Sequence, residues 1–172
     1  MTKTDKDKFK VLFVCTGNTC RSPTAEGILK KMLKEKGIGN FEVGSAGTHG
    51  LKNAPASLFA IEVAKSRKVN LSGHRSRELT AEMICEADLI LAMSQEHLYF
   101  VKRIDQEAEG KAYLLKSFLK SKPPSNEDQN RAVLFIKDPI GGSLRDYEQS
   151  FSEIEKEVKR IFPKILDLTK KR

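Results

Sequence analysis

A nucleophile and a phosphate-binding side chain stand close together near the start of the chain. Cys15 and Arg21 have the spacing Cys-x5-Arg, with Cys20 between them. A thiolate is a strong nucleophile, and a guanidinium offers a planar fork of N–H donors that fits two oxygens of a phosphate group. The pattern therefore indicates attack by sulfur on a bound tetrahedral oxyanion, with a phosphocysteine intermediate that water must hydrolyse.

The residues on either side predict a loop between a strand and a helix. The apolar run Phe9–Val14 leads into the motif, and Pro23–Lys36 follows with apolar residues at helical spacing. Backbone N–H groups of such a loop point into one concavity, and the helix N-terminus adds partial positive charge. We expect this field, together with Arg21, to lower the pKa of the Cys15 thiol.

The remaining loop residues fit a cradle for an anion. Gly17 gives the backbone freedom to curl, and Asn18 is of a type that tolerates a left-handed conformation. A hydrogen bond from Ser22 to the sulfur would make it a better leaving group when the intermediate is hydrolysed. The predicted substrate-binding residues are Thr16, Gly17, Asn18, Thr19, Cys20 and Ser22.

Attack on phosphorus also needs a general acid for the leaving group and a base for water. Asp138 is the best candidate, because it follows the apolar run Val133–Ile136 and precedes Pro139 in a glycine-rich turn. Aspartate before proline is common in ordinary turns, so the catalytic interpretation depends on the cysteine loop.

Other interpretations of the cysteine motif must be weighed. The stretch lacks the Gly-Lys-Ser/Thr ending of a nucleotide P-loop. Cys15 and Cys20 could be metal ligands, but structural zinc takes four ligands and no second Cys or His pair has suitable spacing. The spacing alone also leaves open two inert buried thiols. The strand before the motif and the Ser-Pro-helix sequence after it favour catalysis.

Apolar runs alternate with amphipathic segments along the chain. We expect strands at Phe9–Val14, Phe41–Ser45, Ala87–Met93 and within Ala112–Leu119, and helices at Pro23–Lys36, Pro55–Ser66, Gln95–Ile104 and Arg145–Leu168. This alternation predicts one α/β domain with a parallel sheet. Ligands of such sheets bind at the carboxyl ends of the strands. Four residues that follow apolar runs could converge there: Cys15, Ser45, Met93 and Asp138.

Finer expectations rest on single residues. In the second helix, Leu58, Ile61 and Val63 should contact the core. Pro163 lies inside the last helix and should kink or split it. The stretch Ser121–Gln129 is typical of a surface insertion.

Composition limits the class of protein. The chain has 172 residues, which suits a single domain over 1–172, with 1–7 expected to be flexible. The net charge of +8 fits either solubility or attraction to anionic ligands. Aromatic residues make up 7% and there is no Trp, so a nucleic-acid stacking surface is not indicated. We expect a cytoplasmic monomer that uses no metal or cofactor and binds neither nucleic acid nor membrane.

With these motifs the sequence resembles the low-molecular-weight protein tyrosine phosphatase family. The matching stretches, in the family's order, are Val14–Glu26, Gly44–Thr48, His74–Thr80, Ala87–Met93 and Asp138-Pro139. The resemblance covers the chain from Lys8 onward. It implies a four-stranded parallel sheet flanked by helices on both faces, and metal-independent hydrolysis of phosphorylated proteins.

The resemblance also implies roles. Cys15 matches the nucleophile, Arg21 the phosphate-binding arginine and Asp138 the general acid. Ser22 matches the serine that stabilises the thiolate. Cys20 matches a second loop cysteine, which in the family can form a reversible disulfide with the nucleophile. A supporting network that holds the strained loop is matched by Asn18, Ser45 and His74.

Departures from the family pattern concern the substrate. Tyrosine-specific members carry aromatic pocket walls where this chain has Leu51 and Ile140, and often a bulky aliphatic residue where it has Thr19. These features resemble the bacterial protein-arginine phosphatase branch, in which the threonine is thought to orient water and favour the narrower phosphoguanidinium group. Phosphotyrosine and phosphoarginine in proteins are therefore both expected substrates.

Two other functions use the same loop. An arsenate-reductase-like enzyme would need further redox cysteines, and only Cys85 is available. A non-catalytic phosphate-binding module would be expected to lack Cys15 or Asp138, and the chain has both.

Overall fold

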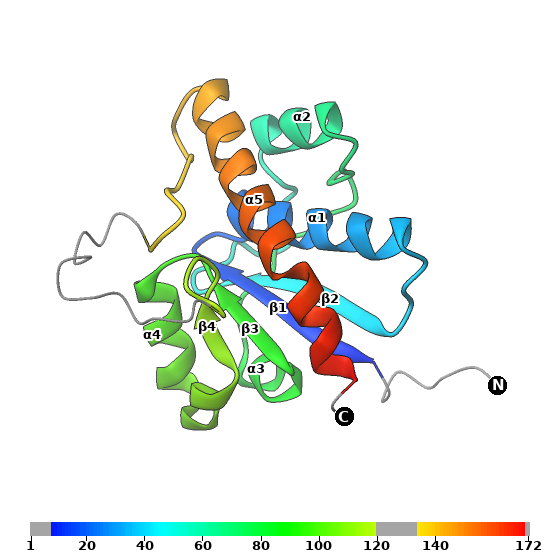
Figure 1. Cartoon of the computed structure of the whole chain (residues 1–172). Helices are drawn as coiled ribbons and strands as arrows, with labels where there is room; N and C mark the ends of the chain where they lie inside the picture. Colours follow the sequence, from blue (N-terminus) through cyan, green and yellow to red (C-terminus); the bar gives the residue numbers. More distant parts are fainter. Residues whose placement is uncertain (1–7, 120–133, 171–172) are drawn as a thin grey trace, which may run out of the picture.

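The computed structural model of the protein describes residues 8–119 and 134–170. Within these ranges four strands form one parallel sheet in the order β2-β1-β3-β4 (Figure 1). The strands are β1 (Phe9–Cys15), β2 (Phe41–Gly47), β3 (Leu89–Ala92) and β4 (Ala112–Leu114). The expected four-stranded parallel sheet is confirmed, although the last strand is shorter than the segment in which it was predicted. The predicted insertion at Ser121–Gln129 and the residues 1–7 lie outside the described ranges.

Helices cover both faces of the sheet, as expected (Figure 1). One face carries α1 (Arg21–Glu35), α2 (Leu58–Ser66) and α5 (Leu144–Thr169), and α5 packs against both α1 and α2. The other face carries α3 (Ala81–Glu86) and α4 (Gln95–Ile104). A short 3₁₀ helix, Gln106–Gly110, leads from α4 to β4.

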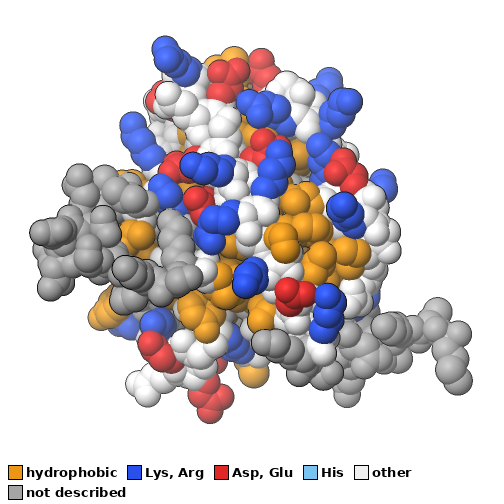
Figure 2. All heavy atoms as spheres, in the orientation of Figure 1, with side chains coloured by type: hydrophobic (Ala, Val, Ile, Leu, Met, Phe, Trp, Pro, Cys, Tyr) orange, Lys and Arg blue, Asp and Glu red, His pale blue; other side chains and the backbone are white. Residues whose placement is uncertain are grey.

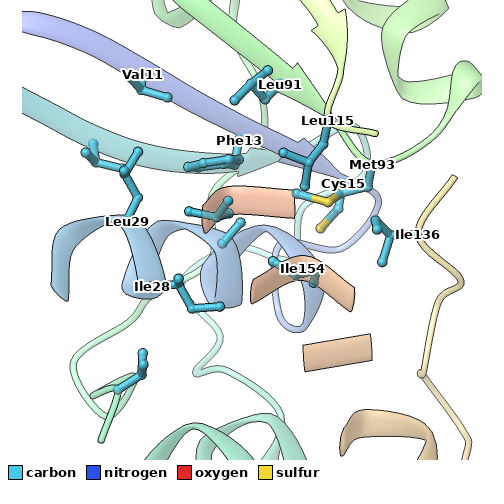
Figure 3. Close-up of a cluster of buried hydrophobic side chains, with 14 of the residues drawn as sticks. Val11, Phe13, Cys15, Ile28, Leu29, Leu91, Met93, Leu115, Ile136 and Ile154 are labelled. Carbon is cyan, nitrogen blue, oxygen red and sulfur yellow. The ribbon is translucent and has the colours of Figure 1, made fainter. Parts of the chain in front are cut away.

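The two central strands supply both layers of the core because successive side chains of a strand point to opposite faces. Phe13 and Leu91 are fully buried on the side of α1 and α5, where Figure 3 shows them above Leu29 and Ile154. Val14 and its neighbours on β3 fill the layer beneath α3 and α4. Burial on both faces explains why β1 and β3 are continuous apolar runs in the sequence.

The carboxyl ends of β1 and β3 form the point at which the strand order reverses. β1 leads through α1 to β2 on one side, and β3 pairs with β1 on the other side. The loops after these two strands therefore leave toward opposite faces, which opens a crevice between them. The segment before Asp138 runs along the same edge, because Ile136 N–H donates to the Met93 carbonyl at 2.8 Å.

One predicted core contact is wrong. Helix α2 begins at Leu58 rather than at Pro55, and Leu58 is 84% exposed. The buried side of this helix carries Ala60 and Val63. Leu58 lies about 200° around the helix from Ala60, because each residue turns the helix by about 100°. Ile61 packs against the edge of the core, as expected.

Charged side chains are spread over the surface. Figure 2 shows Lys and Arg side chains interspersed with acidic ones on the face that it presents, rather than gathered in one patch. Hydrophobic side chains form smaller exposed groups between them. The net charge of +8 is therefore not concentrated on this face.

Pro163 was expected to kink or split the last helix, and the helix is not split. Helix α5 runs through Pro163 as one element. Proline removes the N–H that would bond to the carbonyl of Lys159 one turn earlier. Both residues are exposed, so water can satisfy that carbonyl while the buried side, with Ile161 and Ile165, holds the helix in place.

Replacing this proline tests the continuity of α5. Pro163→Ala should raise the free energy of unfolding by about 1–3 kcal/mol, because proline is the poorest residue in a helix interior. The gain is smaller than the full propensity difference, because proline also stiffens the unfolded chain. Urea unfolding measures the change, with the exposed neighbour Lys164→Ala as control. A less stable Pro163→Ala protein would contradict a regular helix through this position.

Candidate active site

The cysteine loop joins the carboxyl end of β1 to the first turn of α1. Cys15 is the last residue of β1, and α1 begins at Arg21, two residues earlier than predicted from Pro23. The Cys15 side chain lies at the end of the hydrophobic cluster, beside Met93 and Ile136 (Figure 3). It is 2% exposed, so its sulfur forms the floor of the loop.

Hydrogen-bond donors surround this sulfur. Asn18 N–H donates to Cys15 Sγ at 3.3 Å, and Ser22 Oγ lies 2.9 Å from it. The backbone of Ser22 contributes a further hydrogen bond. These contacts place donors where a thiolate, or a leaving thiolate, would carry its charge. The predicted contact between Ser22 and Cys15 is therefore present.

Burial, however, raises the pKa of the Cys15 thiol above its ordinary value, although Arg21, Ser22 and Asn18 all act to lower it. The sequence led us to expect a lowered pKa, so this differs from the expectation. The physical reason is the burial of the sulfur, which outweighs the lowering of the pKa by Arg21 and the hydrogen-bond donors. Asp138 Oδ2 accepts a hydrogen bond from Arg21 Nη2 at 2.5 Å, which reduces the positive field at the sulfur.

Arg21 is buried and held from two further sides. Its Nη1 donates to the Ile136 carbonyl at 3.1 Å, and its Nη2 donates to Thr16 Oγ1 at 3.2 Å. Its Nε is buried without a hydrogen-bond partner in the part of the chain that the structure describes. A buried charged donor that lacks a partner is costly, so an incoming oxyanion would be bound strongly there.

Asn18 holds the shape of the loop. It is fully buried with a left-handed φ of 55°. Its Nδ2 donates to Ser22 Oγ at 2.9 Å and to Ser45 Oγ at 2.8 Å. Its own carbonyl lies 2.7 Å from His74 Nε2. The contacts predicted among Asn18, Ser45 and His74 are thus present.

Two members of this network were missed in the sequence. Arg77 N–H donates to Asn18 Oδ1 at 2.9 Å, and Arg77 Nε donates to the Ser45 carbonyl at 2.9 Å. Ser45 Oγ donates to Glu26 Oε2 at 2.5 Å. Glu26 follows Ser22 by one helical turn on α1, so helical spacing could have placed it on the face toward the loop.

The end of β2 supports the loop from behind. A Cβ atom on Gly47 would lie 2.4 Å from the Thr16 carbonyl oxygen and 3.0 Å from Asn18 N. Thr48 N–H and His49 N–H donate to the carbonyls of Cys15 and Thr16 at 2.9 and 3.0 Å. Only glycine allows the two backbones to approach this closely.

A histidine that the sequence did not point to completes the site. His97 lies on the first turn of α4 and is 3% exposed. Its Nε2 lies 2.8 Å from Thr16 Oγ1, and its Nδ1 lies 2.9 Å from Ser94 Oγ. Its position soon after β3 was the available signal, because loops after neighbouring parallel strands meet at one edge.

These residues surround a hollow that is open to solvent. Thr16, Arg21, His97 and Asp138 all line a cavity of about 860 Å³. The three cysteines are free thiols, and Cys20 Sγ lies 3.2 Å from Ser57 Oγ. Among the described residues no group of three or more His, Cys, Asp and Glu side chains could hold a metal ion.

Comparison with known proteins identifies the family. Residues 10–172 match the low molecular weight phosphotyrosine protein phosphatase family. The chain belongs to this family. It is 40% identical over 146 residues to the low molecular weight protein-tyrosine-phosphatase Etp of Escherichia coli K12, covering 85% of this chain and 87% of Etp. It is 34% identical over 151 residues to a protein-arginine-phosphatase of Bacillus subtilis, covering 88% and 93%.

Solved structures agree with this assignment. A low molecular weight protein tyrosine phosphatase from T. tengcongensis superimposes with a TM-score of 0.80 at 34% identity, covering 91% of this chain and 99% of that one. A YwlE arginine phosphatase mutant with a phosphorylated active-site serine has a TM-score of 0.80 at 30% identity, covering 91% and 95%. A phosphorylated active-site residue supports a covalent phosphoenzyme mechanism, and the chain is a protein phosphatase.

The hydrogen bonds of Asn18 and its left-handed backbone could each set the stability of the loop, and a pair of variants separates the two. Asn18→Ala should lower the free energy of unfolding by about 2–4 kcal/mol, because it leaves several buried polar groups unpaired. Asn53 provides a matched control, since it has a similar φ of 58° but an exposed side chain. Urea unfolding of both alanine variants measures the difference. Equal losses would mean that φ, rather than the network, sets the stability of the loop.

The ion pair at Arg21 gives a second prediction, on thiol reactivity. Asp138→Asn should free the guanidinium charge, lower the pKa of Cys15 and speed its alkylation at pH 7 by about tenfold. Iodoacetamide labelling followed by mass spectrometry measures the rate, in a Cys85→Ser background because Cys85 is exposed. Glu96→Gln, which removes a carboxylate from the same cavity, is the control. No acceleration in Asp138→Asn would mean that burial alone sets this pKa.

Proposed function

We propose that this phosphatase removes phosphoryl groups from protein side chains through a phosphocysteine formed on Cys15. The observation that carries the proposal is that a nucleophilic sulfur and a buried guanidinium lie beside each other. The sulfur accepts hydrogen bonds from the loop backbone, and the buried Arg21 guanidinium beside it keeps an unpartnered Nε among the described residues. A phosphoryl group seated between them would have its phosphorus above the sulfur.

In the first step the phosphoryl oxygens take the place of the Asp138 carboxylate on Arg21. The released Asp138 carboxylate takes the proton of the Cys15 thiol. Cys15 Sγ then attacks phosphorus, so that an S–P bond forms as the bond to the leaving oxygen or nitrogen breaks. Asp138, on a turn at the rim, gives its proton to that leaving atom. Its side chain is 35% exposed, so it can reach both Arg21 and a substrate above it.

In the second step water attacks phosphorus and the S–P bond breaks. Asp138, now a carboxylate, takes a proton from the water. The electron pair returns to Cys15 Sγ, where Ser22 Oγ at 2.9 Å stabilises the thiolate. Inorganic phosphate then leaves, Asp138 returns its proton to the Cys15 thiolate, and its carboxylate can pair with Arg21 again.

For the substrate we propose phosphoarginine in preference to phosphotyrosine. The residues at the expected pocket walls, Leu51 and Ile140, are 61% and 65% exposed and offer no ring for stacking on a phenyl group. Thr19 brings a hydroxyl rather than an aliphatic branch into the loop, where its Oγ1 lies 3.7 Å from Cys20 Sγ. The relatives named protein-arginine-phosphatase are compatible with this preference.

The test compares matched phosphoarginine and phosphotyrosine peptides. The wild-type protein should have the higher kcat/KM on phosphoarginine, and Cys15→Ser should lose turnover of both peptides. Thr19→Ile should shift the ratio toward phosphotyrosine by at least about tenfold, which is the scale of one methyl group in a pocket. Cys85→Ser is the control, since it removes an exposed thiol on α3.

The two parts of the proposal fail separately. Turnover that persists in Cys15→Ser would exclude the phosphocysteine. A phosphotyrosine preference that Thr19→Ile leaves unchanged would exclude the substrate assignment alone. Asp138→Asn adds a check on the acid, because its loss of about 10²-fold or more on phosphotyrosine should shrink with an activated aryl phosphate.

The proposed compartment is the cytoplasm. Among the described residues no helix has the length and apolarity needed to span a bilayer. The nucleophile must also stay reduced, and reducing compartments keep thiols free. The arsenate-reductase alternative is not favoured, because the relatives carry phosphatase names and Cys85 sits on α3, across the sheet from α1. The monomeric state stays a prediction.

A further inference from the structure

His97 lines the cavity and is joined to the cysteine loop by a contact with the hydroxyl of Thr16. Its Nε2 lies 2.8 Å from Thr16 Oγ1, and that oxygen accepts a hydrogen bond from Arg21 Nη2 at 3.2 Å. Ser94, at the N-cap of α4, holds the other ring nitrogen at 2.9 Å. One hydroxyl therefore joins the loop after β1 and the first turn of α1 to the first turn of α4, which is 81 positions away in the sequence.

The hydroxyl has a defined orientation only if His97 accepts. Thr16 has one proton, and one of its lone pairs is taken by Arg21 Nη2. A neutral His97 with its proton on Nδ1 donates to Ser94 and leaves Nε2 to accept from Thr16. A protonated ring would point an N–H at Thr16 and bring a second positive charge next to the guanidinium.

The surroundings favour the neutral ring. Burial, followed by the charges of Arg21 and His49, lowers the pKa of His97 to about 4. His97 is therefore uncharged near neutral pH and adds no second positive charge beside the guanidinium. A lysine or arginine in this place would add charge but could not accept the Thr16 proton.

We propose that His97 is a positioning residue. It accepts a hydrogen bond from the Thr16 hydroxyl, and this contact fixes Thr16 Oγ1 as the acceptor that holds the Arg21 guanidinium in place for phosphate. The proposal rests on the proposed function, since Arg21 is there the group that binds the phosphoryl oxygens. It adds a residue from α4 to a site otherwise built from β1, α1 and the Asp138 turn. Thr16 thereby becomes a connecting residue rather than a passive part of the loop.

Isosteric variants separate this role from simple packing. His97→Leu keeps a buried side chain of similar size but cannot accept the proton, whereas His97→Gln retains an acceptor at the end of its side chain. Thr16→Val keeps the shape of Thr16 and removes the hydroxyl. Each variant is made singly, and His97→Leu is also combined with Thr16→Val.

The primary readout is binding of inorganic phosphate by titration calorimetry, together with KM and kcat on an aryl phosphate. His97→Leu should weaken phosphate binding and raise KM by about five- to tenfold, the scale of one lost hydrogen bond. The change in kcat should be smaller, because Arg21 binds ground state and transition state alike. His97→Gln should recover most of the affinity.

The double variant gives the sharper result. If His97 acts through the Thr16 hydroxyl, Thr16→Val should cause a similar loss, and adding His97→Leu to it should cost less than about twofold more. Losses that multiply, or a His97→Leu protein that binds phosphate normally, would overturn the proposal. Urea unfolding of every variant measures its stability. If weaker phosphate binding came from a general loss of folding, His97→Gln would show it as well as His97→Leu.

An Arg21→Ala variant separates the failure of this proposal from that of the proposed function. Normal phosphate binding by Arg21→Ala would contradict the phosphate-binding role of Arg21, and with it both proposals. Loss of binding in Arg21→Ala together with unchanged binding in His97→Leu would overturn the positioning role alone.

Discussion

Burial of the Arg21 charge is the constraint on which the rest of the site depends. A guanidinium cannot give up its proton at accessible pH, so a buried one must be surrounded by acceptors or by negative charge. The chain supplies a carbonyl from the segment before Asp138, a hydroxyl from the loop after β1, and the Asp138 carboxylate itself. These acceptors come from two segments that are far apart in the sequence, so the charge ties the carboxyl edge of the sheet together.

The anion site and its support differ in chemistry. Around the sulfur and the guanidinium the structure places N–H and O–H donors, which suit a dianion. Behind the loop lies a neutral network centred on Asn18, in which donors and acceptors are matched within the protein. Two charged side chains, Glu26 and Arg77, contact this network at Ser45. The loop can therefore keep its shape while its inner surface remains strongly attractive to anions.

The sequence correctly predicted the parts of the structure that depend on local pattern. Continuous apolar runs located β1 and β3, and the spacing of Cys15 and Arg21 located the loop. Effects that depend on distant partners were missed. His97 is 81 positions from Thr16, and its role depends on which strands are neighbours in the sheet. The exposure of Leu58 depends on where α2 begins, and the raised pKa of Cys15 depends on how deeply the loop is buried.

In the resting site the Asp138 carboxylate is bound to Arg21, and it therefore competes with incoming anions for the guanidinium. A carboxylate attached to the chain is present beside the guanidinium at a high effective concentration, so any ligand must displace it. Acetate or chloride would exchange one negative charge for one and gain little. A phosphoryl dianion brings twice the charge and more acceptor oxygens, and it can also bind Arg21 Nε, which has no hydrogen-bond partner among the described residues. The site therefore binds dianions in preference to the abundant monoanions of a cell. This selection by charge does not depend on contacts with the rest of the substrate.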